Sequence, residues 1–218
     1  MKWAIRAANL AIFLGVALLV LSFYPVINDE FWYFFRQIKH QQIILSYSGV
    51  PVVTDSPFAR LLSTRPITVV PVNKDFSIVI EKIGVNAPIV KDVPVTDELA
   101  YKSALKSGVA HASTSPYPSE KPGNVYLFAH ASTNFWELGK YATVFNLLRK
   151  LEKGDRIHIF YEEGEFVYEV VNKEVLKGWN TYPITRPTIE PTLTLQTCDP
   201  PGTTLNRLVV TAKLLEVK

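Results

Sequence analysis

Apolar residues form one unbroken stretch near the N-terminus. From Ala7 to Ile27 the chain reads AANLAIFLGVALLVLSFYPVI, without a charge. As a helix rising about 1.5 Å per residue, this stretch reaches about 30 Å, the thickness of a bilayer core. It predicts a membrane anchor at 7–27 after a short cytoplasmic tail at 1–6. A cleaved signal peptide is the alternative, but the run exceeds the usual length of about 7 to 15 residues and no A-x-A-like site follows it.

The charges on either side of this stretch bear on its orientation. Lys2 and Arg6 precede it, while Arg36 and Lys39 follow it, so the basic residues are nearly balanced. The compact N-terminal charge and the large domain that follows favour an N-terminus inside the cell and an extracellular domain. The chain is therefore expected in the cell membrane as a single-pass protein.

Residues 28–71 form a second region of different composition. In 28–48, aromatic and basic residues interleave, a pattern compatible with a helix near the membrane surface or with a helix packed on the following domain. His40 is expected in solvent there. Residues 49–71 contain four prolines without a clear period, which predicts an extended linker. The folded domain is expected at 72–218.

Within 72–218, several runs have the two-residue period of strands. Phe76–Glu81 has large apolar residues at alternate positions, and Gly84–Val90 adds a turn and a second apolar run. A further buried strand begins at Val125 and ends at His130.

A hairpin is expected between residues 156 and 170. Apolar residues alternate at its start, and Glu162–Glu165 turns the chain. His158 should lie beside Arg156 on the wetter face of this hairpin. Residues 179–191 then read as a long loop without period, and such loops are often functional.

Short helices are expected between the strands. The stretch 96–98 offers a helix start and Gly108 a stop. Between 144 and 151, apolar residues fall at i, i+3, i+4 and i+7, which predicts a helix packed on the core that ends before Gly154. About eight strands and two or three short helices together indicate a mainly β protein, a mostly antiparallel β-barrel.

Composition narrows the classes of function. The 218 residues suffice for one core domain and an appendage, and the formal net charge of +3 falls close to neutral without Lys2 and Arg6. Nothing indicates nucleic-acid binding. A single cysteine excludes an internal disulfide and multi-cysteine metal sites. Neither a phosphate-binding glycine loop nor a defensible set of acidic ligands is present, so no cofactor or metal is expected.

The candidate catalytic residues are concentrated in the last two apolar runs of the chain. Cys198 ends one run, and Arg207 opens the next, nine residues on. The turn formers between them, from Asp199 to Gly202, predict a hairpin that brings the thiol and the guanidinium together at one edge. The alternative is an inert, buried cysteine, the commonest fate of a lone one.

Such a thiol needs partners to act as a nucleophile. An unperturbed thiol, with a pKa of about 8.5, is only a few per cent thiolate at neutral pH. Histidine exchanges protons near pH 7, and His130, at a strand end, is the best candidate, with His111 in reserve. Arg207 can hydrogen-bond the oxyanion that forms when a peptide carbonyl is attacked.

Several segments resemble one known family. Residues 194–198, TLQTC, resemble the TLxTC signature of sortases, the cell-surface cysteine transpeptidases, and 207–210 resemble the arginine-led strand after it. The hairpin IVIEKIGVNAPIV resembles their first hairpin. The GVAH element and the strand ending at His130 are also similar, with Ala129 where the family commonly has glycine. The resemblance covers about 76–214.

This resemblance implies a closed eight-stranded sortase-like β-barrel with short helices. It also implies Cys198 as nucleophile, His130 as acid and base, and Arg207 as the stabilising cation, while Asp199 belongs to the turn. The loop at 179–191 would help to shape the substrate groove.

The implied substrates are secreted proteins that carry an LPxTG-like sorting motif near the C-terminus. The motif is cleaved through a thioester and joined to an amine acceptor such as a cell-wall precursor or a pilin lysine. Two alternatives stay open. One is an anchored β-domain that binds a partner without catalysis, and the other is a different cysteine enzyme that acts on cell-wall peptides.

Overall fold

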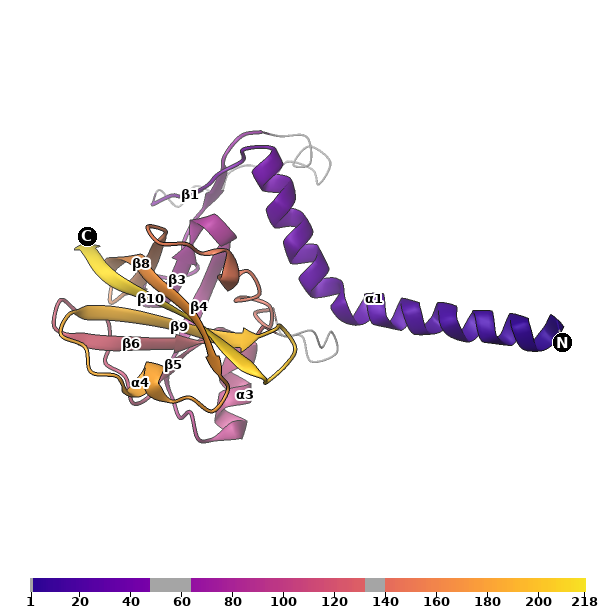
Figure 1. Cartoon of the computed structure of the whole chain (residues 1–218). Coiled ribbons are helices and arrows are strands. Elements are labelled where there is room, and N and C mark those ends of the chain that lie inside the picture. Colours follow the sequence, from indigo (N-terminus) through magenta and orange to yellow (C-terminus); the bar gives the residue numbers. More distant parts are fainter. Residues whose placement is uncertain (1, 48–63, 132–139) are drawn as a thin grey trace.

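The computed structural model describes residues 2–47, 64–131 and 140–218. A long N-terminal helix leads to a closed barrel of eight strands (Figure 1). Around the barrel the strands follow the order β10-β8-β7-β3-β4-β5-β6-β9. Their bounds are β3 Phe76–Ile80, β4 Val85–Val93, β5 Val109–Ala112, β6 Gly123–Phe128, β7 Arg156–Tyr161, β8 Gly164–Lys177, β9 Pro191–Asp199 and β10 Asn206–Val217. The predicted eight-stranded barrel is confirmed.

Most neighbouring strands run antiparallel, as predicted. The exceptions are β4 with β5 and β6 with β9, which pair in parallel. The parallel pairing of β6 with β9 matters for function, because both strands then end at the same edge of the barrel. The interior is filled by large aliphatic and aromatic side chains, among them Ile78, Leu127, Ile159, Tyr168 and Leu195.

A small two-stranded sheet lies outside the barrel. Its strands, β1 (Ile43–Leu45) and β2 (Ile67–Val69), pair in parallel. Leu45 and Val69 pack against Val79 and Phe160, which face outward from the barrel. All of β3 is therefore buried rather than alternately exposed. Of the predicted linker at 49–71, residues 48–63 lie outside the described residues and β2 forms part of the remainder.

This outer sheet also corrects the expectation for His158. The side chain is only 6% exposed, and its Nδ1 lies 2.7 Å from Glu165 Oε1. The Tyr47 hydroxyl, from the segment that follows β1, donates to the same carboxylate. The face predicted to be wet is covered by chain from before the barrel. That long-range packing leaves no mark on the local pattern of the hairpin.

Helix α3 (Glu98–Ser107) confirms the predicted start and stop. The Asp97 side chain caps its N-terminus by accepting from the backbone N–H groups of Leu99 and Ala100. The helix ends before Gly108. A second short helix, α4 (Tyr182–Thr185), lies within the stretch predicted as a long loop.

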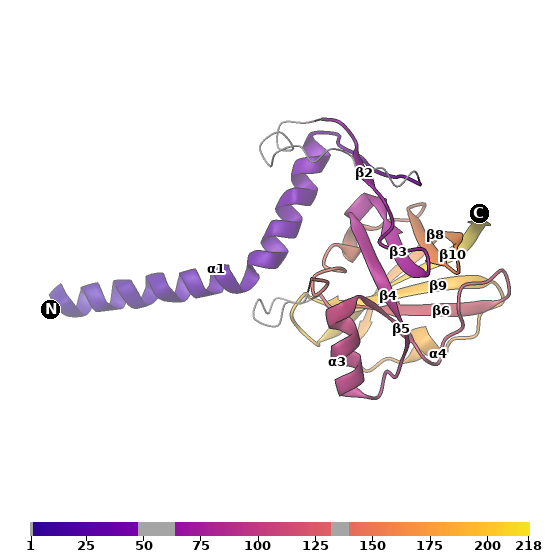
Figure 2. The same ribbon diagram turned by 180° about the vertical axis from the view of Figure 1, so that it is seen from behind.

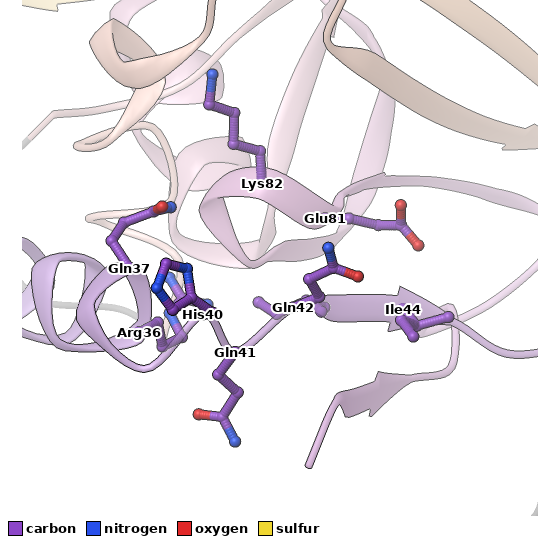
Figure 3. A pocket seen from close by; sticks show the side chains of 9 residues that line it. Arg36, Gln37, His40, Gln41, Gln42, Ile44, Glu81 and Lys82 are labelled. Atoms are coloured by element: carbon purple, nitrogen blue, oxygen red, sulfur yellow. The ribbon is translucent and has the colours of Figure 1, made fainter. Parts of the chain in front are cut away.

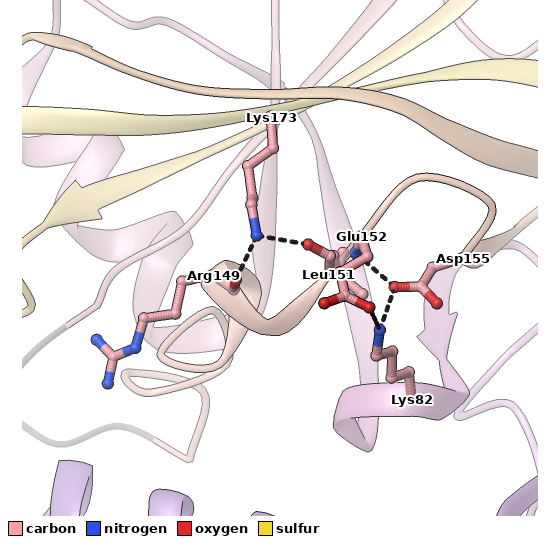
Figure 4. Close-up of polar contacts among 6 residues, drawn as sticks. All are labelled: Lys82, Arg149, Leu151, Glu152, Asp155 and Lys173. Atoms are coloured by element: carbon pink, nitrogen blue, oxygen red, sulfur yellow. Dashed lines mark hydrogen bonds and ion pairs between the residues drawn. The ribbon is translucent and has the colours of Figure 1, made fainter.

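The predicted helix at 144–151 is wrong. Residues 140–147 form successive turns, and only Leu148–Lys150 make a 3-10 helix, η3. Figure 4 shows how the end of this stretch is bonded: Lys173 Nζ binds the carbonyls of Arg149 and Leu151, each at 2.7 Å, and Asp155 accepts from the N–H of Glu152. The leucines of this stretch are buried in the core, as their spacing predicts.

Helix α1 (Lys2–Ile38) precedes the barrel as one continuous element. It is long and apolar enough to cross a membrane, and nearly all of its apolar stretch is exposed. The helix continues eleven residues beyond the predicted anchor at 7–27, so the anchor and the following helix are not separate elements. It bends near Pro25, and its second half runs alongside the barrel (Figures 1 and 2).

Candidate active site

Cys198 and Arg207 face each other across the hairpin of β9 and β10. The two residues are direct partners in the antiparallel register. Arg207 Nη1 lies 3.6 Å from Cys198 Sγ. The hairpin predicted from the turn residues thus places the thiol beside the guanidinium, within reach of a charge-assisted contact.

Two backbone carbonyls also hold the Arg207 guanidinium in place. Arg207 Nη1 donates to the carbonyls of Thr204 and Asn206 at 3.3 and 3.2 Å. Gly178, after the end of β8, packs closely here, since a Cβ at this position would lie 2.6 Å from Thr204 O and 3.6 Å from Arg207 Nη1. A larger residue at 178 would therefore push the arginine or its turn out of place.

His130 follows β6 at the same edge of the barrel. Phe128 pairs with Gln196 in the parallel register of β6 and β9. Beyond that pair, the Ala129 N–H donates to Gln196 O at 3.1 Å, and Thr197 Oγ1 donates to Ala129 O at 2.9 Å. If this register continued for two residues, His130 would lie level with Cys198. Directly after His130, the chain is bonded to the β9–β10 turn, because the Gly202 N–H donates to Ala131 O.

Tyr101 on α3 joins this group, although no sequence pattern indicates it. Its ring stacks on Phe128 with centroids 5.2 Å apart and meets the His130 ring edge-on at 5.9 Å and 90°. Burial raises the pKa of Tyr101, a Cys198 thiolate raises it further, and Arg207 lowers it. Tyr101 thus lies within electrostatic range of both Cys198 and Arg207 while it touches the imidazole.

Burial and a nearby charge shift the pKa of the Cys198 thiol in opposite directions. Burial raises the pKa of Cys198 above its ordinary value, and the nearby Arg207 cation offsets part of that rise. The side chain is only partly buried, so it remains open to a reactant. A thiol of this kind is protonated at neutral pH and needs a base to become a nucleophile.

Polar side chains continue from Cys198 along β6, β9 and β10. The Tyr126 hydroxyl donates to Gln196, two residues before the cysteine. Further along, Thr194 Oγ1 donates to Asn124 Oδ1 at 2.6 Å. Arg186, from the segment after α4, donates through Nη2 to Thr194 and Thr211 at 2.8 and 2.9 Å. This arginine ties the 179–191 segment to the face that leads to Cys198.

The structure separates His111 from these residues. Its ring is fully buried, with Nε2 2.9 Å from Ser115 Oγ and 3.2 Å from Pro116 O, and it stacks on Tyr117. Burial lowers the pKa of His111, which favours a neutral ring. On its other side, Nδ1 lies 3.5 Å from the Asp92 backbone N and 3.7 Å from Asp92 Oδ1, and none of these described contacts involves Cys198 or Arg207. His40 is exposed, as predicted.

A pocket in the described part of the chain lies elsewhere, where α1 meets the 3-10 helix η1 (Glu81–Ile83) (Figure 3). It is lined by Arg36, Gln37, His40, Gln41, Gln42, Ile43, Ile44, Glu81 and Lys82. Lys82 is drawn away from it to Glu152 and Asp155, at 3.1 and 2.8 Å (Figure 4). We interpret this pocket as a junction between elements, since it contains neither a nucleophile nor a paired acid and base. Within 2–47, 64–131 and 140–218, no group of three or more His, Cys, Asp or Glu residues could hold a metal ion.

Comparison with known proteins agrees with this geometry. Residues 78–215 match the family described as Sortase domain. Sortase D of Bacillus subtilis (strain 168) is 33% identical over 121 residues, which cover 56% of this chain and 52% of that protein. The chain thus matches about half the length of this curated relative.

Solved sortase structures share the fold of the barrel. Sortase C-1 from Actinomyces oris is 28% identical, with a TM-score of 0.54 over 66% of this chain and 76% of that one. A sortase D5 transpeptidase from Clostridium perfringens is 26% identical, with a TM-score of 0.52 over 66% of this chain and 80% of that one. The match at 78–215 includes Cys198 on β9, Arg207 on β10 and His130 after β6. On this evidence the chain belongs to the sortase family.

Proposed function

We propose that this protein is a cysteine transpeptidase of the cell surface. It cleaves a sorting motif near the C-terminus of secreted proteins and joins the new carboxyl end to an amine. The observation that supports the proposal is the contact of Arg207 Nη1 with the sulfur of Cys198 at 3.6 Å, at the barrel edge where β6 leads into His130. These three residues are the proposed catalytic group.

In the first half of the reaction, Cys198 attacks the scissile carbonyl. His130 accepts the thiol proton as the sulfur–carbon bond forms, because the raised pKa of Cys198 leaves few thiolates at neutral pH. Arg207 donates to the oxyanion of the tetrahedral intermediate. The carbon–nitrogen bond then breaks, and His130 returns its proton to the departing amine. A thioester on Cys198 remains.

In the second half, an acceptor amine attacks the thioester carbonyl. His130 takes a proton from the amine, Arg207 again stabilises the oxyanion, and the Cys198 thiolate leaves and recovers that proton. The product is a new amide bond. Because the thioester stores the energy of the broken amide, no external energy source is needed.

The proposed partners follow from the family. The donor is a secreted protein with an LPxTG-like motif, and the acceptor is an amine such as that of a cell-wall precursor or a pilin lysine. Helix α1 supports membrane anchoring, with residues 1–6 inside the cell and the barrel outside. Substrates that emerge from translocation would then reach the enzyme beside the membrane.

Mass spectrometry of a peptide assay tests the proposal. The full-length protein is incubated with LPxTG-like peptides and an amine donor, and amide product is expected. Cys198→Ala and His130→Ala should abolish turnover and leave the fold intact. Hydrolysis without amide product would instead support a different cysteine enzyme. If no peptide turns over and a thiol reagent labels Cys198 only after denaturation, the protein is a binding domain.

A further inference from the structure

The second half of α1 has two unlike faces. One face contacts the barrel: Asp29 Oδ2 accepts from Asn146 Nδ2 at 3.0 Å, and Glu30 pairs with Arg149 and Lys150. Lys150 Nζ also lies 5.4 Å above the Tyr33 ring. These contacts fix which side of the helix faces the barrel.

The opposite face is apolar and exposed. With about 3.6 residues per turn, Ile27, Phe31, Phe34 and Ile38 fall on the side away from Asp29 and Tyr33. Their side chains are 52%, 54%, 63% and 59% exposed. Contiguous apolar surface of this kind marks a contact with another apolar phase.

The position of this face in the chain indicates which phase covers it. It continues directly from the charge-free stretch at 7–27, in the same helix. The helix contains Pro25 and bends between its two halves, so the second half leaves the axis of the first (Figure 1). A helix that leaves a membrane span at an angle, with large aromatic and aliphatic residues on one side, is suited to lie in the interface of the bilayer.

We propose that residues 27–38 lie along the membrane surface, with Ile27, Phe31, Phe34 and Ile38 at the boundary between headgroups and acyl chains. The barrel then rests on the opposite face of the same helix, through Asp29 and Glu30. This inference rests on the proposed membrane anchoring of α1. It assigns the face that meets lipid and fixes the side on which the barrel lies.

The arrangement has a consequence for the active site. In Figures 1 and 2, the turn that joins β9 to β10 lies on the side of the barrel from which the first half of α1 extends. Cys198 and Arg207 flank this turn. A barrel resting on an interfacial helix would hold its Cys198 edge toward the bilayer, close to where a secreted substrate leaves the membrane.

Spin labels on the full-length protein in lipid nanodiscs test the inference. In a Cys198→Ala background, which removes the one native cysteine, single cysteines replace Phe34 on the apolar face, Gln37 toward the barrel side and Leu18 in the span. The ratio of oxygen to nickel-chelate accessibility reports contact with lipid. We expect several-fold higher ratios at 34 and 18 than at 37. Ile38→Cys repeats the measurement near the end of the helix, in case the change at 34 disturbs folding.

Three other outcomes overturn the inference, and they can be told apart. A lipid-like signal at 18 with water-like signals at 34 and 38 rejects the interfacial face but keeps the anchor. A water-like signal at 18 rejects the anchoring itself. Shielding at 34 that occurs only in discs with more than one copy shows that a second chain covers the face instead of lipid.

Discussion

At Cys198, burial and one cation act on the pKa of the thiol in opposite directions. Burial raises the pKa of Cys198, and Arg207 lowers it in part. Arg207→Gln should therefore raise the pKa of the thiol further. Because only the thiolate reacts, the protein should be alkylated several-fold more slowly at pH 8, and the rate should rise at higher pH than in the parent. Intact-mass analysis of iodoacetamide labelling measures this at one site, since Cys198 is the only cysteine.

Lys213→Gln is the matched control for that experiment. It removes a cation from the same strand, but one that pairs with Glu190 and is half exposed. Its labelling profile should follow the parent. Equal slowing in both variants would mean that net charge, and not the contact between Arg207 and Cys198, controls the thiol.

Arg207→Lys tests what the guanidinium does during the reaction. A lysine keeps the charge but not the forked set of donors, so the oxyanion loses part of its stabilisation. We expect kcat/KM for transpeptidation to fall by about 10²- to 10³-fold, the usual effect of losing one oxyanion donor. Lys213→Arg, measured in parallel, should leave kcat/KM unchanged.

Tyr101 is expected to position His130 through its ring alone. Its described contacts with Phe128 and His130 are ring contacts. Tyr101→Phe should keep activity, whereas Tyr101→Ala should lower kcat/KM by about tenfold or more, because the imidazole loses a packing surface. The pH dependence of kcat/KM separates positioning from general destabilisation. If the pH profile of kcat/KM kept its shape in Tyr101→Ala, the result would argue against a contact of Tyr101 with His130 that matters for catalysis.

These residues also show which parts of the candidate site could be predicted from the sequence. The meeting of Cys198 and Arg207 could be predicted, because a hairpin is local and its turn residues set the register. His130 could be placed at a strand end, but the local sequence does not show that β6 pairs in parallel with β9 and so ends at the same barrel edge as the Cys198 strand. Tyr101 is one of ten tyrosines and has no distinguishing pattern. Its role arises from how α3 packs, which a single sequence does not encode locally.

Among the elements, α3 is a helix whose N-terminal cap supports a residue of the candidate site. Asp97 Oδ1 accepts from two backbone N–H groups at 3.0 Å, and the helix that it caps carries Tyr101. Asp97→Ala should lower the free energy of unfolding by about 1 kcal/mol. Asp97→Asn, which keeps an accepting oxygen, should cost much less. Urea denaturation compares the two, and equal losses would show that the carboxylate charge matters more than the cap.

The segment after α4 offers a test of substrate binding. Arg186 bridges it to Thr194 and Thr211 on the face that leads to Cys198. Arg186→Ala should free the segment and raise KM for the sorting peptide by about tenfold, the effect of losing roughly 1.4 kcal/mol of binding, while kcat changes little. The exposed Arg156 of β7 provides the control, since Arg156→Ala removes a guanidinium from another strand. A loss in kcat alone would contradict a role in binding.

The features that the sequence missed involve partners from distant parts of the chain. The apolar spacing at 144–151 is helical, yet turns and a short 3-10 helix form there, and Lys173 from β8 binds the carbonyls of Arg149 and Leu151 at their end. His158 is covered in the same way by a segment that precedes the barrel. Period and turn chemistry predict strands and caps. They do not report a partner from a distant part of the chain.

For the whole molecule, the contact between α1 and the barrel would set where the proposed active site lies relative to the bilayer if α1 lies at the membrane surface as proposed. One carboxylate oxygen of Glu30 pairs with Arg149. The other lies 2.9 Å from Lys150 Nζ. Each group is about one-third exposed. Single ion pairs of this kind contribute about 1 kcal/mol or less, so removing one charge would be hard to detect. Reversing the charge gives a larger signal, because attraction then becomes repulsion.

Glu30→Arg should separate the barrel from the helix. Amide hydrogen exchange in 140–147, the turns that contain Asn146 beside Asp29, should then accelerate several-fold in nanodiscs, because α1 no longer covers them. Glu30→Arg combined with Arg149→Glu and Lys150→Glu restores opposite charges and should recover protection, which a misfolded helix would not do. Glu98→Arg reverses a fully exposed carboxylate on α3 and should change nothing in 140–147. If Glu30→Arg matched Glu98→Arg, the barrel would not be held by this contact, and the height of Cys198 above the bilayer would have to be set by another part of the chain.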